Sequence, residues 1–203
     1  MPQKAAKILY LWAMIKLKHP LILGSQSPRR QQLLKDMGLD FEVIVRPVDE
    51  YAPQEMHPRA VAVLISENKA KAFDDLSPEN IILTADTIVS LNGEVMGKPA
   101  DDQEAVDMLK KLSGRTHEVV SGVTVFHKGK FSSFAELTEV SFRKLSDYEI
   151  SYYIEHFKPN DKAGAYGIQD WIGKIGISRI EGDYYNVMGL PTSRLYQELL
   201  QYA

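Results

Sequence analysis

Short apolar runs and helical apolar stripes alternate along this chain, and each predicts one element. The run at 21–24 predicts a buried strand, and Ser27 followed by Pro28 predicts the start of a helix that Gly38 ends. The longest apolar run, 81–91, predicts a strand that turns back at Asn92-Gly93. The same patterns predict further strands at 41–48, 117–126, 131–145, 174–180 and 184–188, and helices at 58–74, 102–112, 146–157 and from 192 onward. Alternating strands and helices predict an α/β fold.

Composition narrows the class of protein. The chain has 203 residues, 44% of them hydrophobic and 25% charged, which is typical of a globular protein. A formal net charge of −3 gives no overall basic field that would recruit nucleic acid, so a polyanionic substrate would need a local cluster of Arg and Lys. The absence of cysteine excludes a thiol nucleophile and a thiolate metal site, and it suits a cytoplasmic location.

The first residues stand apart from the rest. The apolar run 8–15 with its flanking lysines is superficially similar to a signal peptide, but it is too short to span a membrane and no small-residue cleavage site follows it. Met14 precedes the first predicted strand, which favours a later start. We therefore predict an N-terminal extension at 1–13 that need not be native and a single domain at 14–203, with no membrane segment.

The turn Ser25-Gln-Ser27-Pro-Arg29-Arg30 joins the first strand to the first helix. A helix start offers unpaired N–H groups and the positive end of the dipole, so anions bind there. Two arginines in the first turn oppose that dipole unless an anion such as phosphate cancels them. The alternative is a capped surface helix whose arginines pair with Asp or Glu elsewhere. The turn is not a Walker loop, because the Gly-Lys-Ser/Thr pattern is missing.

A carboxylate lies in the middle of the strongest predicted strand. Asp is a poor strand former, and burying it unpaired costs several kcal/mol, so Asp86 needs a partner or a task. The task could be that of a general base toward water, a metal ligand, or both. The alternative is an exposed edge or bulge where Asp86 faces solvent.

Two lysines and two other polar residues are weaker candidates. Lys69 lies on the apolar stripe of its helix, where a lysine commonly reaches past the stripe to solvent. Counting back from the turn pairs Thr87 with Lys98, and a regular pleat would then put Lys98 and Asp86 on opposite faces unless Pro99 or a bulge distorts the strand. Glu50 ends a strand-like segment, where acidic residues are usually only solvated. Gln169, in a glycine-rich loop at 161–170, could read the edge of a base, although a loop glutamine often has no such role.

Taken together, the chain resembles the Maf family of nucleotide pyrophosphatases. The matching segments occur in order: SQSPRRQQLL (25–34), VDE (48–50), ENKAKA (67–72), TADTIV (84–89), GEVMGKP (93–99), LSGRTHEVVSGV (112–123), DKAGAYGIQ (161–169) and GLP (189–191). Each segment alone is weak, but the ordered set is highly specific and covers almost all of the chain after residue 20.

The resemblance implies an α/β fold with a mixed, inosine triphosphatase-like sheet and two lobes around a central cleft, in a homodimer. It implies hydrolysis of a nucleoside triphosphate to the monophosphate and pyrophosphate with a divalent cation, Mg or Mn. By resemblance, Asp86 is the general base. As a mechanistic hypothesis we add that Glu50 and Asp86 hold the metal. The same resemblance assigns substrate binding to Ser25, Ser27, Arg29, Arg30, Glu50, Lys69, Thr87, Lys98 and Gln169.

Three of these positions, Arg29, Thr87 and Gln169, resemble the specificity set of the branch that acts on dTTP and UTP, with modified pyrimidine nucleotides as possible further substrates. The alternatives are the branch that prefers 7-methyl-GTP, which typically carries an aromatic residue in the first turn, and a non-catalytic nucleotide-binding regulator of septum formation. A kinase is disfavoured because no phosphate-loop lysine is present. Asp170-Trp171 departs from the small residues common in the family, and this departure could alter selectivity.

Overall fold

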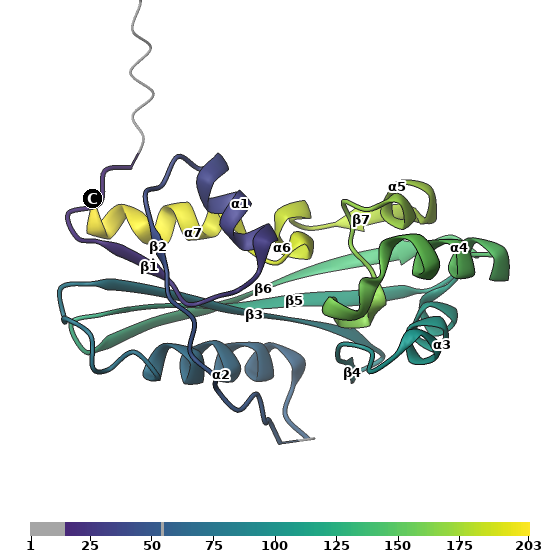
Figure 1. Cartoon of the computed structure of the whole chain (residues 1–203), viewed down its shortest axis with the longest axis horizontal. Helices are drawn as coiled ribbons and strands as arrows, with labels where there is room; N and C mark the ends of the chain where they lie inside the picture. The colour runs from purple at the N-terminus through teal and green to yellow at the C-terminus, as the bar shows by residue number, and fades with distance from the viewer. Residues whose placement is uncertain (1–14, 54) are drawn as a thin grey trace, which may run out of the picture.

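A mixed sheet of seven strands forms the centre of the protein (Figure 1). The computed structural model describes residues 15–53 and 55–203, so the predicted extension at 1–13 lies outside the described residues. The strands are β1 (Leu21–Leu23), β2 (Glu42–Val43), β3 (Ile81–Leu91), β4 (Glu94–Met96), β5 (Thr116–His127), β6 (Lys130–Phe142) and β7 (Ile177–Glu181). The helices are α1 (Pro28–Asp36), α2 (Pro58–Lys71), α3 (Asp102–Leu112), α4 (Asp147–Phe157), α5 (Trp171–Gly176), α6 (Tyr184–Met188) and α7 (Thr192–Leu199), with short 3₁₀ turns η1 (Pro159–Asp161), η2 (Ala163–Ala165) and η3 (Leu200–Tyr202).

One edge of β3 is paired at both ends but not in the middle. The strand order is β2-β1-β3-β5-β6-β7, and β4 pairs with β3 outside this path. β1 runs parallel to β3 and its pairing stops at Leu83, whereas antiparallel β4 begins to pair at Val89. Within the described chain, no strand pairs with residues 84–88 along this edge, while β5 pairs with β3 along the opposite edge. The carboxyl end of β1 therefore points into an opening in the sheet, where sites of α/β proteins usually form.

Helices cover both faces of the sheet. α2 lies along one face, and α1 and α7 lie along the other (Figure 1). α2 packs Val61, Ala62 and Ile65 against Ile88 and its neighbours because these apolar side chains share one side of the helix. The approach is close: a Cβ on Gly122 of β5 would lie 2.2 Å from the backbone of Ala62. Glycine at this position is what lets the helix rest directly on the strand.

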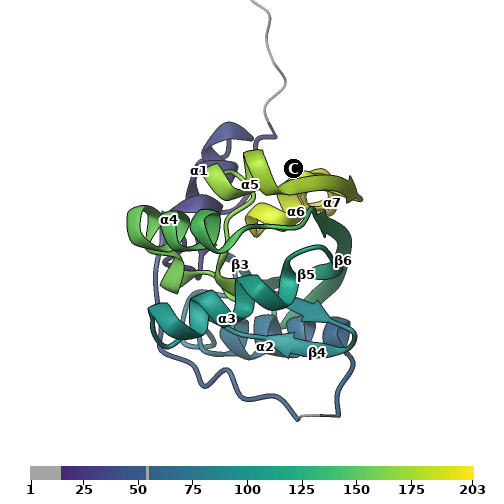
Figure 2. The same cartoon turned by 90° about the vertical axis from the view of Figure 1, so that its right-hand side faces the viewer.

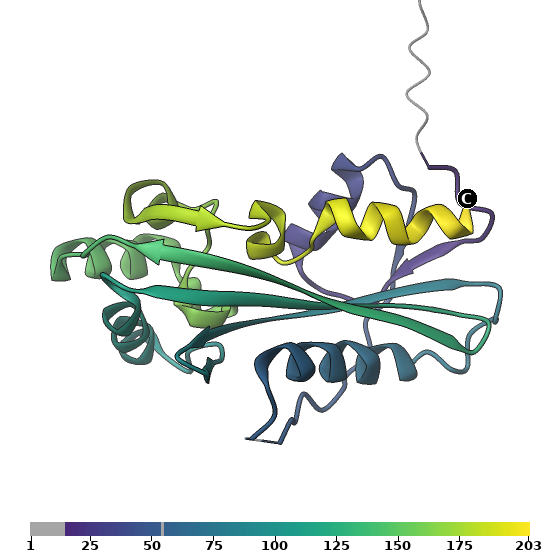
Figure 3. The ribbon, with the colours of Figure 1, turned by 180° about the vertical axis from the view of Figure 1, so that it is seen from behind.

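The two ends of the long strands carry separate hydrophobic cores. At one end, β1, α1 and α7 pack around residues such as Leu23, Leu34 and Leu195. At the other end, α3, α4 and α5 pack around residues such as Leu109 and Tyr153 (Figure 2). β3, β5 and β6 run through both ends (Figure 3). The expected α/β fold, with a mixed sheet and two lobes, is confirmed.

Beyond shifts of a few residues at element ends, three predicted strands were wrong in part or in whole. The strand expected at 41–48 is only Glu42–Val43, because the chain then leaves the sheet edge toward the cleft, and Pro47 has no N–H for a ladder. The segment 174–180 begins in α5, and only its second half belongs to β7. The segment 184–188 is α6 instead of a strand. Asp183 caps this helix at the N–H of Tyr185 and Gly189, at φ 119°, ends it, so local capping outweighed the apolar pattern.

Candidate active site

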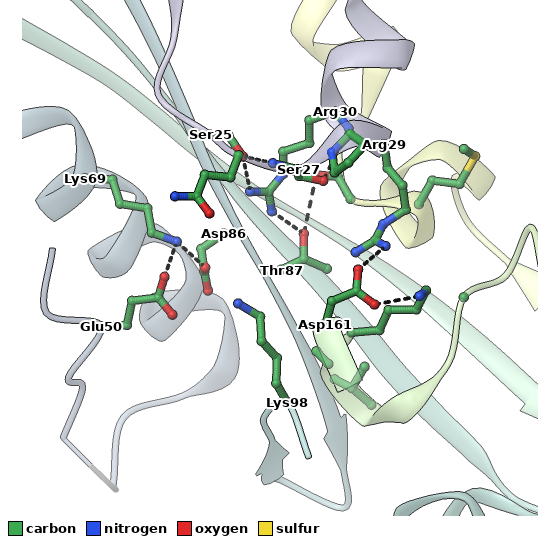
Figure 4. A pocket seen from close by; sticks show the side chains of 18 of the residues that line it. Ser25, Ser27, Arg29, Arg30, Glu50, Lys69, Asp86, Thr87, Lys98 and Asp161 are labelled. Atoms are coloured by element: carbon green, nitrogen blue, oxygen red, sulfur yellow. Dashed lines mark hydrogen bonds and ion pairs between the residues drawn. The ribbon is translucent and has the colours of Figure 1, made fainter. Parts of the chain in front are cut away.

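A cleft of about 690 Å³ opens where the edge of β3 is unpaired (Figure 4). Its walls come from the β1–α1 turn, the segment 45–50, α2, β3, the loop 161–169 and the end of α6. The structure brings all ten predicted site residues to this one cleft, namely Ser25, Ser27, Arg29, Arg30, Glu50, Lys69, Asp86, Thr87, Lys98 and Gln169. Ser25 and Gln169, which are 144 positions apart in the sequence, therefore both line this cleft between the two lobes.

The turn before α1 is organised by its two serines. Ser27 caps the helix by accepting a hydrogen bond from Arg30 N at 3.4 Å, as predicted. Ser25 Oγ accepts from Ser27 N at 3.2 Å, which fixes the turn that precedes the helix. Pro28 occupies the first helical position. The start of α1 thus faces the cleft, and the positive end of the helix dipole points toward any anion bound there.

Arg30 is held entirely by neutral acceptors. Its guanidinium donates to Gly189 O at 2.8 Å, Ala85 O at 2.8 Å, Thr87 Oγ1 at 3.0 Å and Ser25 Oγ at 3.2 Å. The Ala85 carbonyl belongs to the unpaired edge of β3, so Arg30 replaces a missing strand partner there. Burial lowers the pKa of Arg30 while the nearby Asp86 carboxylate opposes that shift, and an arginine stays charged in a protein. Among the described residues no carboxylate forms an ion pair with Arg30, so its charge remains available to an anion.

The preceding arginine has the opposite environment. Arg29 Nη1 lies 3.0 Å from Asp161 Oδ2, and Lys162 Nζ lies 2.6 Å from the other oxygen of the same carboxylate. Burial alone would raise the pKa of Asp161, but the hydrogen bonds from Lys162 and Arg29 outweigh it and hold that pKa below its ordinary value. Pairing with a distant acid, the alternative considered for both arginines, is therefore realised for Arg29 and not for Arg30.

Asp86 is partnered through a lysine of α2. Lys69 Nζ lies 2.7 Å from Asp86 Oδ1 and 2.7 Å from Glu50 Oε1, so one ammonium joins two carboxylates (Figure 4). The side chains of Asp86 and Lys69 are only 13% and 16% exposed, which excludes an aspartate that faces solvent and a lysine that reaches out to it. Burial would raise the pKa of Glu50, but the hydrogen bond and charge of Lys69, with smaller contributions from Lys98 and Arg30, lower it.

Lys98 reaches the cleft by a different route from the predicted one. The hairpin register is confirmed at Val89–Met96 and Leu91–Glu94, but β4 ends at Met96, so the predicted pairing of Thr87 with Lys98 does not form. Beyond β4 the carbonyl of Gly97 accepts from Gly164 N at 3.0 Å, which draws the chain toward η2 and away from the ladder. Lys98 is then exposed at the rim of the cleft and needs no bulge to approach Asp86.

Thr87 points to the opposite face from Asp86, as the pleat requires. Its hydroxyl accepts from Arg30, contacts Ser121 Oγ at 2.8 Å and donates to Gly189 O at 3.4 Å. These contacts link β3, β5 and the end of α6. Thr87 therefore acts on the cleft mainly by holding Arg30.

The far end of the cleft is formed by the loop 161–169. Gln169 Oε1 is buried and has no hydrogen-bond partner among the described residues. The loop is anchored from behind, because Tyr153 OH donates to Asp170 Oδ2 at 2.7 Å and accepts from Gly167 N at 3.1 Å. Asp170, the departure from the family pattern, thus positions the loop that carries Gln169. An acceptor left free in an otherwise anchored loop is suited to an N–H of a ligand.

Sequence reasoning missed several residues of this end. Asp161 and Lys162 lay in a glycine-rich loop that also matched the family, but neither was assigned a role. Their charges were the signal that could have singled them out. Tyr166 also lines the cleft, and its hydroxyl lies 2.7 Å from His117 Nε2. Burial lowers the pKa of His117 to about 4, so this pair is neutral at physiological pH. Tyr166 and His117 therefore add a neutral pair to the lining of the cleft.

The described residues, 15–53 and 55–203, contain no group of three or more His, Cys, Asp or Glu side chains that could hold a metal ion. Glu50 and Asp86 remain as a pair of carboxylates that share one cation, Lys69. In the same part of the chain, no helix combines the length and the apolar character that crossing a membrane requires.

Comparison with known protein sequences gives a consistent result. The family model of the Maf-like protein matches residues 20–202. A "dTTP/UTP pyrophosphatase" of Phocaeicola vulgatus is 50% identical over 184 residues, which cover 90% of this chain and 95% of that protein. Proteins of the same name from Cytophaga hutchinsonii and Porphyromonas gingivalis are 49% and 45% identical, covering 88% and 92% of this chain and 82% and 96% of their own lengths. Among solved structures, a HAM1 protein from Coxiella burnetii is similar over 61% of this chain and 73% of that chain, with a TM-score of 0.41 and 16% identity.

Proposed function

This chain belongs to the family of Maf-like proteins, and from that premise we propose that it hydrolyses dTTP and UTP to the monophosphate and pyrophosphate. The names of relatives at 45–50% identity support this substrate class. The observation that carries the proposal is the Arg30 guanidinium, charged and held only by neutral acceptors, in the same cleft as Asp86. A triphosphate would supply the negative charge that balances this guanidinium.

The phosphates would bind at the start of α1. The dipole of that helix, Arg30 and Lys98 supply positive charge, and Ser25 and Ser27 hold the turn. Asp86 would accept a proton from a water molecule while the water oxygen forms a bond to the α-phosphorus. The bond from that phosphorus to the bridging oxygen breaks, and pyrophosphate leaves. Positioning and charge stabilisation would provide most of the acceleration, because this reaction requires little covalent chemistry of the protein.

Glu50 and Asp86 fit a divalent cation such as Mg²⁺ or Mn²⁺. The donor set is chemically suitable, since Mg²⁺ is usually bound by one or two carboxylates together with substrate phosphates. In this structure a cation already stands between the two groups, namely the ammonium of Lys69. When bound, the metal would neutralise charge on the phosphate oxygens.

The base would lie at the Gln169 end. Thymine and uracil present an imide N–H, and the unpartnered Gln169 Oε1 is an acceptor for it, whereas the corresponding nitrogen of cytosine carries no hydrogen. Val187 and Met188 add apolar surface to the cleft. Of the predicted specificity set, Gln169 and Arg29 would act on the base end directly, and Thr87 through its hold on Arg30. The homodimer and the cytoplasmic location stay predictions.

A substrate panel tests the proposal. Pyrophosphate release is measured from dTTP, UTP, CTP and 7-methyl-GTP, with the expectation that dTTP and UTP are preferred. Asp86→Asn should lower kcat by about 10²–10⁴-fold, because it removes the base, while nucleotide binding survives. Glu139→Gln is the control, since it likewise replaces a carboxylate by a carboxamide, at an exposed position of β6. It should leave the rate unchanged.

Each alternative function predicts a different result in these measurements. A preference for 7-methyl-GTP would move the chain to the related branch of the family. Nucleotide binding without pyrophosphate release from any substrate would favour the non-catalytic regulator. Full activity of Asp86→Asn would remove Asp86 from the role of base.

A further inference from the structure

Lys69 occupies the position that a metal ion would need. Its Nζ contacts one oxygen of Glu50 and one of Asp86, both at 2.7 Å, and these are the two carboxylates assigned above to a divalent cation. A metal bound to the same oxygens would compete with the ammonium for them and would meet its positive charge. The two cations therefore exclude each other at this pair of carboxylates.

The fold fixes the backbone of Lys69, so its side chain is the part that can move. Lys69 lies in the last turn of α2, between Ser66, which bonds to Thr84 and Thr124 of the sheet, and the buried Ala70. The backbone is thus fixed against the sheet, while the side chain ends on a flexible four-carbon stem. A change of rotamer can carry the ammonium away from the carboxylates, but the helix itself stays in place.

A triphosphate would provide the reason for such a change. Its oxygens would enter from the side of Arg30 and Ser25, in the same cleft, and would offer the ammonium an alternative set of negative partners. Once Lys69 turns to the phosphates, Glu50 and Asp86 lose their counter-ion and become free to bind a divalent cation.

We propose that Lys69 is a resident counter-ion that keeps the metal out of the nucleotide-free protein and moves onto the phosphates when nucleotide binds. Metal and nucleotide then bind with positive coupling, and each raises the affinity for the other by the same factor. The inference rests on the proposed function for the nature of the ligand. Its central consequence, weak metal binding in the absence of nucleotide, is independent of whether any substrate is hydrolysed.

The test measures Mn²⁺ binding without nucleotide, from the electron paramagnetic resonance signal of free Mn²⁺. Lys69→Met should bind Mn²⁺ at least about tenfold more tightly than the unaltered protein, because the competing charge has gone. Lys98→Met is the matched control: it removes the same charge from the same cleft, but Lys98 forms no ion pair with a described carboxylate. It should change the affinity by less than about threefold, since a charge at the rim is screened by solvent and salt.

A second substitution locates the bound ion. Adding Asp86→Asn to Lys69→Met should remove the gain in Mn²⁺ affinity. Circular dichroism melting checks that each variant is folded, and Lys69→Gln, which keeps a hydrogen-bond donor without the charge, replaces Lys69→Met if that variant is unfolded.

Three results would overturn the inference. The first is an equal increase in Mn²⁺ affinity in Lys98→Met and Lys69→Met. It would mean that the total positive charge of the cleft, and not the contact made by Lys69, weakens metal binding. The second is an increase in Mn²⁺ affinity in Lys69→Met that persists after Asp86→Asn is added. The third result requires only the unaltered protein. It is an Mn²⁺ affinity that is the same in the absence and in the presence of the non-hydrolysable α,β-methylene analogue of UTP.

Discussion

The two ends of the cleft hold their positive charges in different ways. At the end formed by β1, α1 and β3, Arg30 is fixed by four neutral acceptors and has no acidic partner among the described residues. At the end formed by the loop 161–169, Arg29 and Lys162 are both neutralised by Asp161. Two adjacent arginines on one helix turn thus have opposite electrostatic environments.

This difference supports the proposal that the two ends bind different parts of a nucleotide. An uncompensated and partly buried guanidinium favours the group with the highest negative charge, the triphosphate. A neutralised end with a free amide oxygen, near the neutral pair of Tyr166 and His117, favours an uncharged base. The predictions below test this division, in order of decreasing effect.

The largest effect is expected at Arg30. Arg30→Lys should lower kcat/KM for UTP by about 10²–10³-fold, because a point charge cannot replace a fixed guanidinium fork at the phosphates. It should also cost about 1–3 kcal/mol of unfolding free energy, since the carbonyls of Ala85 and Gly189 lose donors. Steady-state kinetics and thermal melts measure the two quantities.

Arg29→Lys is the control for this experiment, since it makes the same change one residue away. It should lower kcat/KM by less than about tenfold, because Lys can still pair with Asp161. Equal losses for the two variants would abolish the distinction between the ends of the cleft.

An intermediate effect is expected at Gln169, and it should depend on the base. Gln169→Leu should lower kcat/KM for UTP by about 10–100-fold, because the imide N–H is then buried without an acceptor. The kcat/KM for CTP should fall less, because the corresponding nitrogen of cytosine carries no hydrogen. Gln169→Glu retains an acceptor and should preserve the preference for UTP over CTP. If Gln169→Leu lowers both rates equally, the residue does not read the base.

The smallest effect is expected at Asp161, whose side chain is 58% exposed. Asp161→Asn releases Arg29 and Lys162, and it should lower KM by no more than about threefold, because an exposed ion pair contributes little. The added positive charge should also make KM more sensitive to salt. Kinetics at several ionic strengths measure both changes. A rise of KM by an order of magnitude would instead indicate that Asp161 contacts the substrate.

Local sequence signals predicted much of the fold and the turn that begins α1 at the cleft. Ser27 and Pro28 marked the start of α1, and Asn92-Gly93 set a hairpin register that the structure confirms. Local signals failed at 184–188, where apolar spacing indicated a strand but a cap at Asp183 and a stop at Gly189 produce a helix. They failed again at 41–48, because a strand needs a partner and the neighbour of β2 ends early.

By itself, the sequence determined which residues have the chemistry for this site and, through the ordered motifs, that they belong together. These properties reside in side-chain types and short-range backbone preferences, which are visible along the chain. Only the tertiary structure decided that Asp161 neutralises Arg29 and leaves Arg30 free, and that Lys69 stands between Glu50 and Asp86. Those ion pairs join residues of separate elements. They therefore depend on how the elements pack around the part of β3 that has no strand partner along one edge.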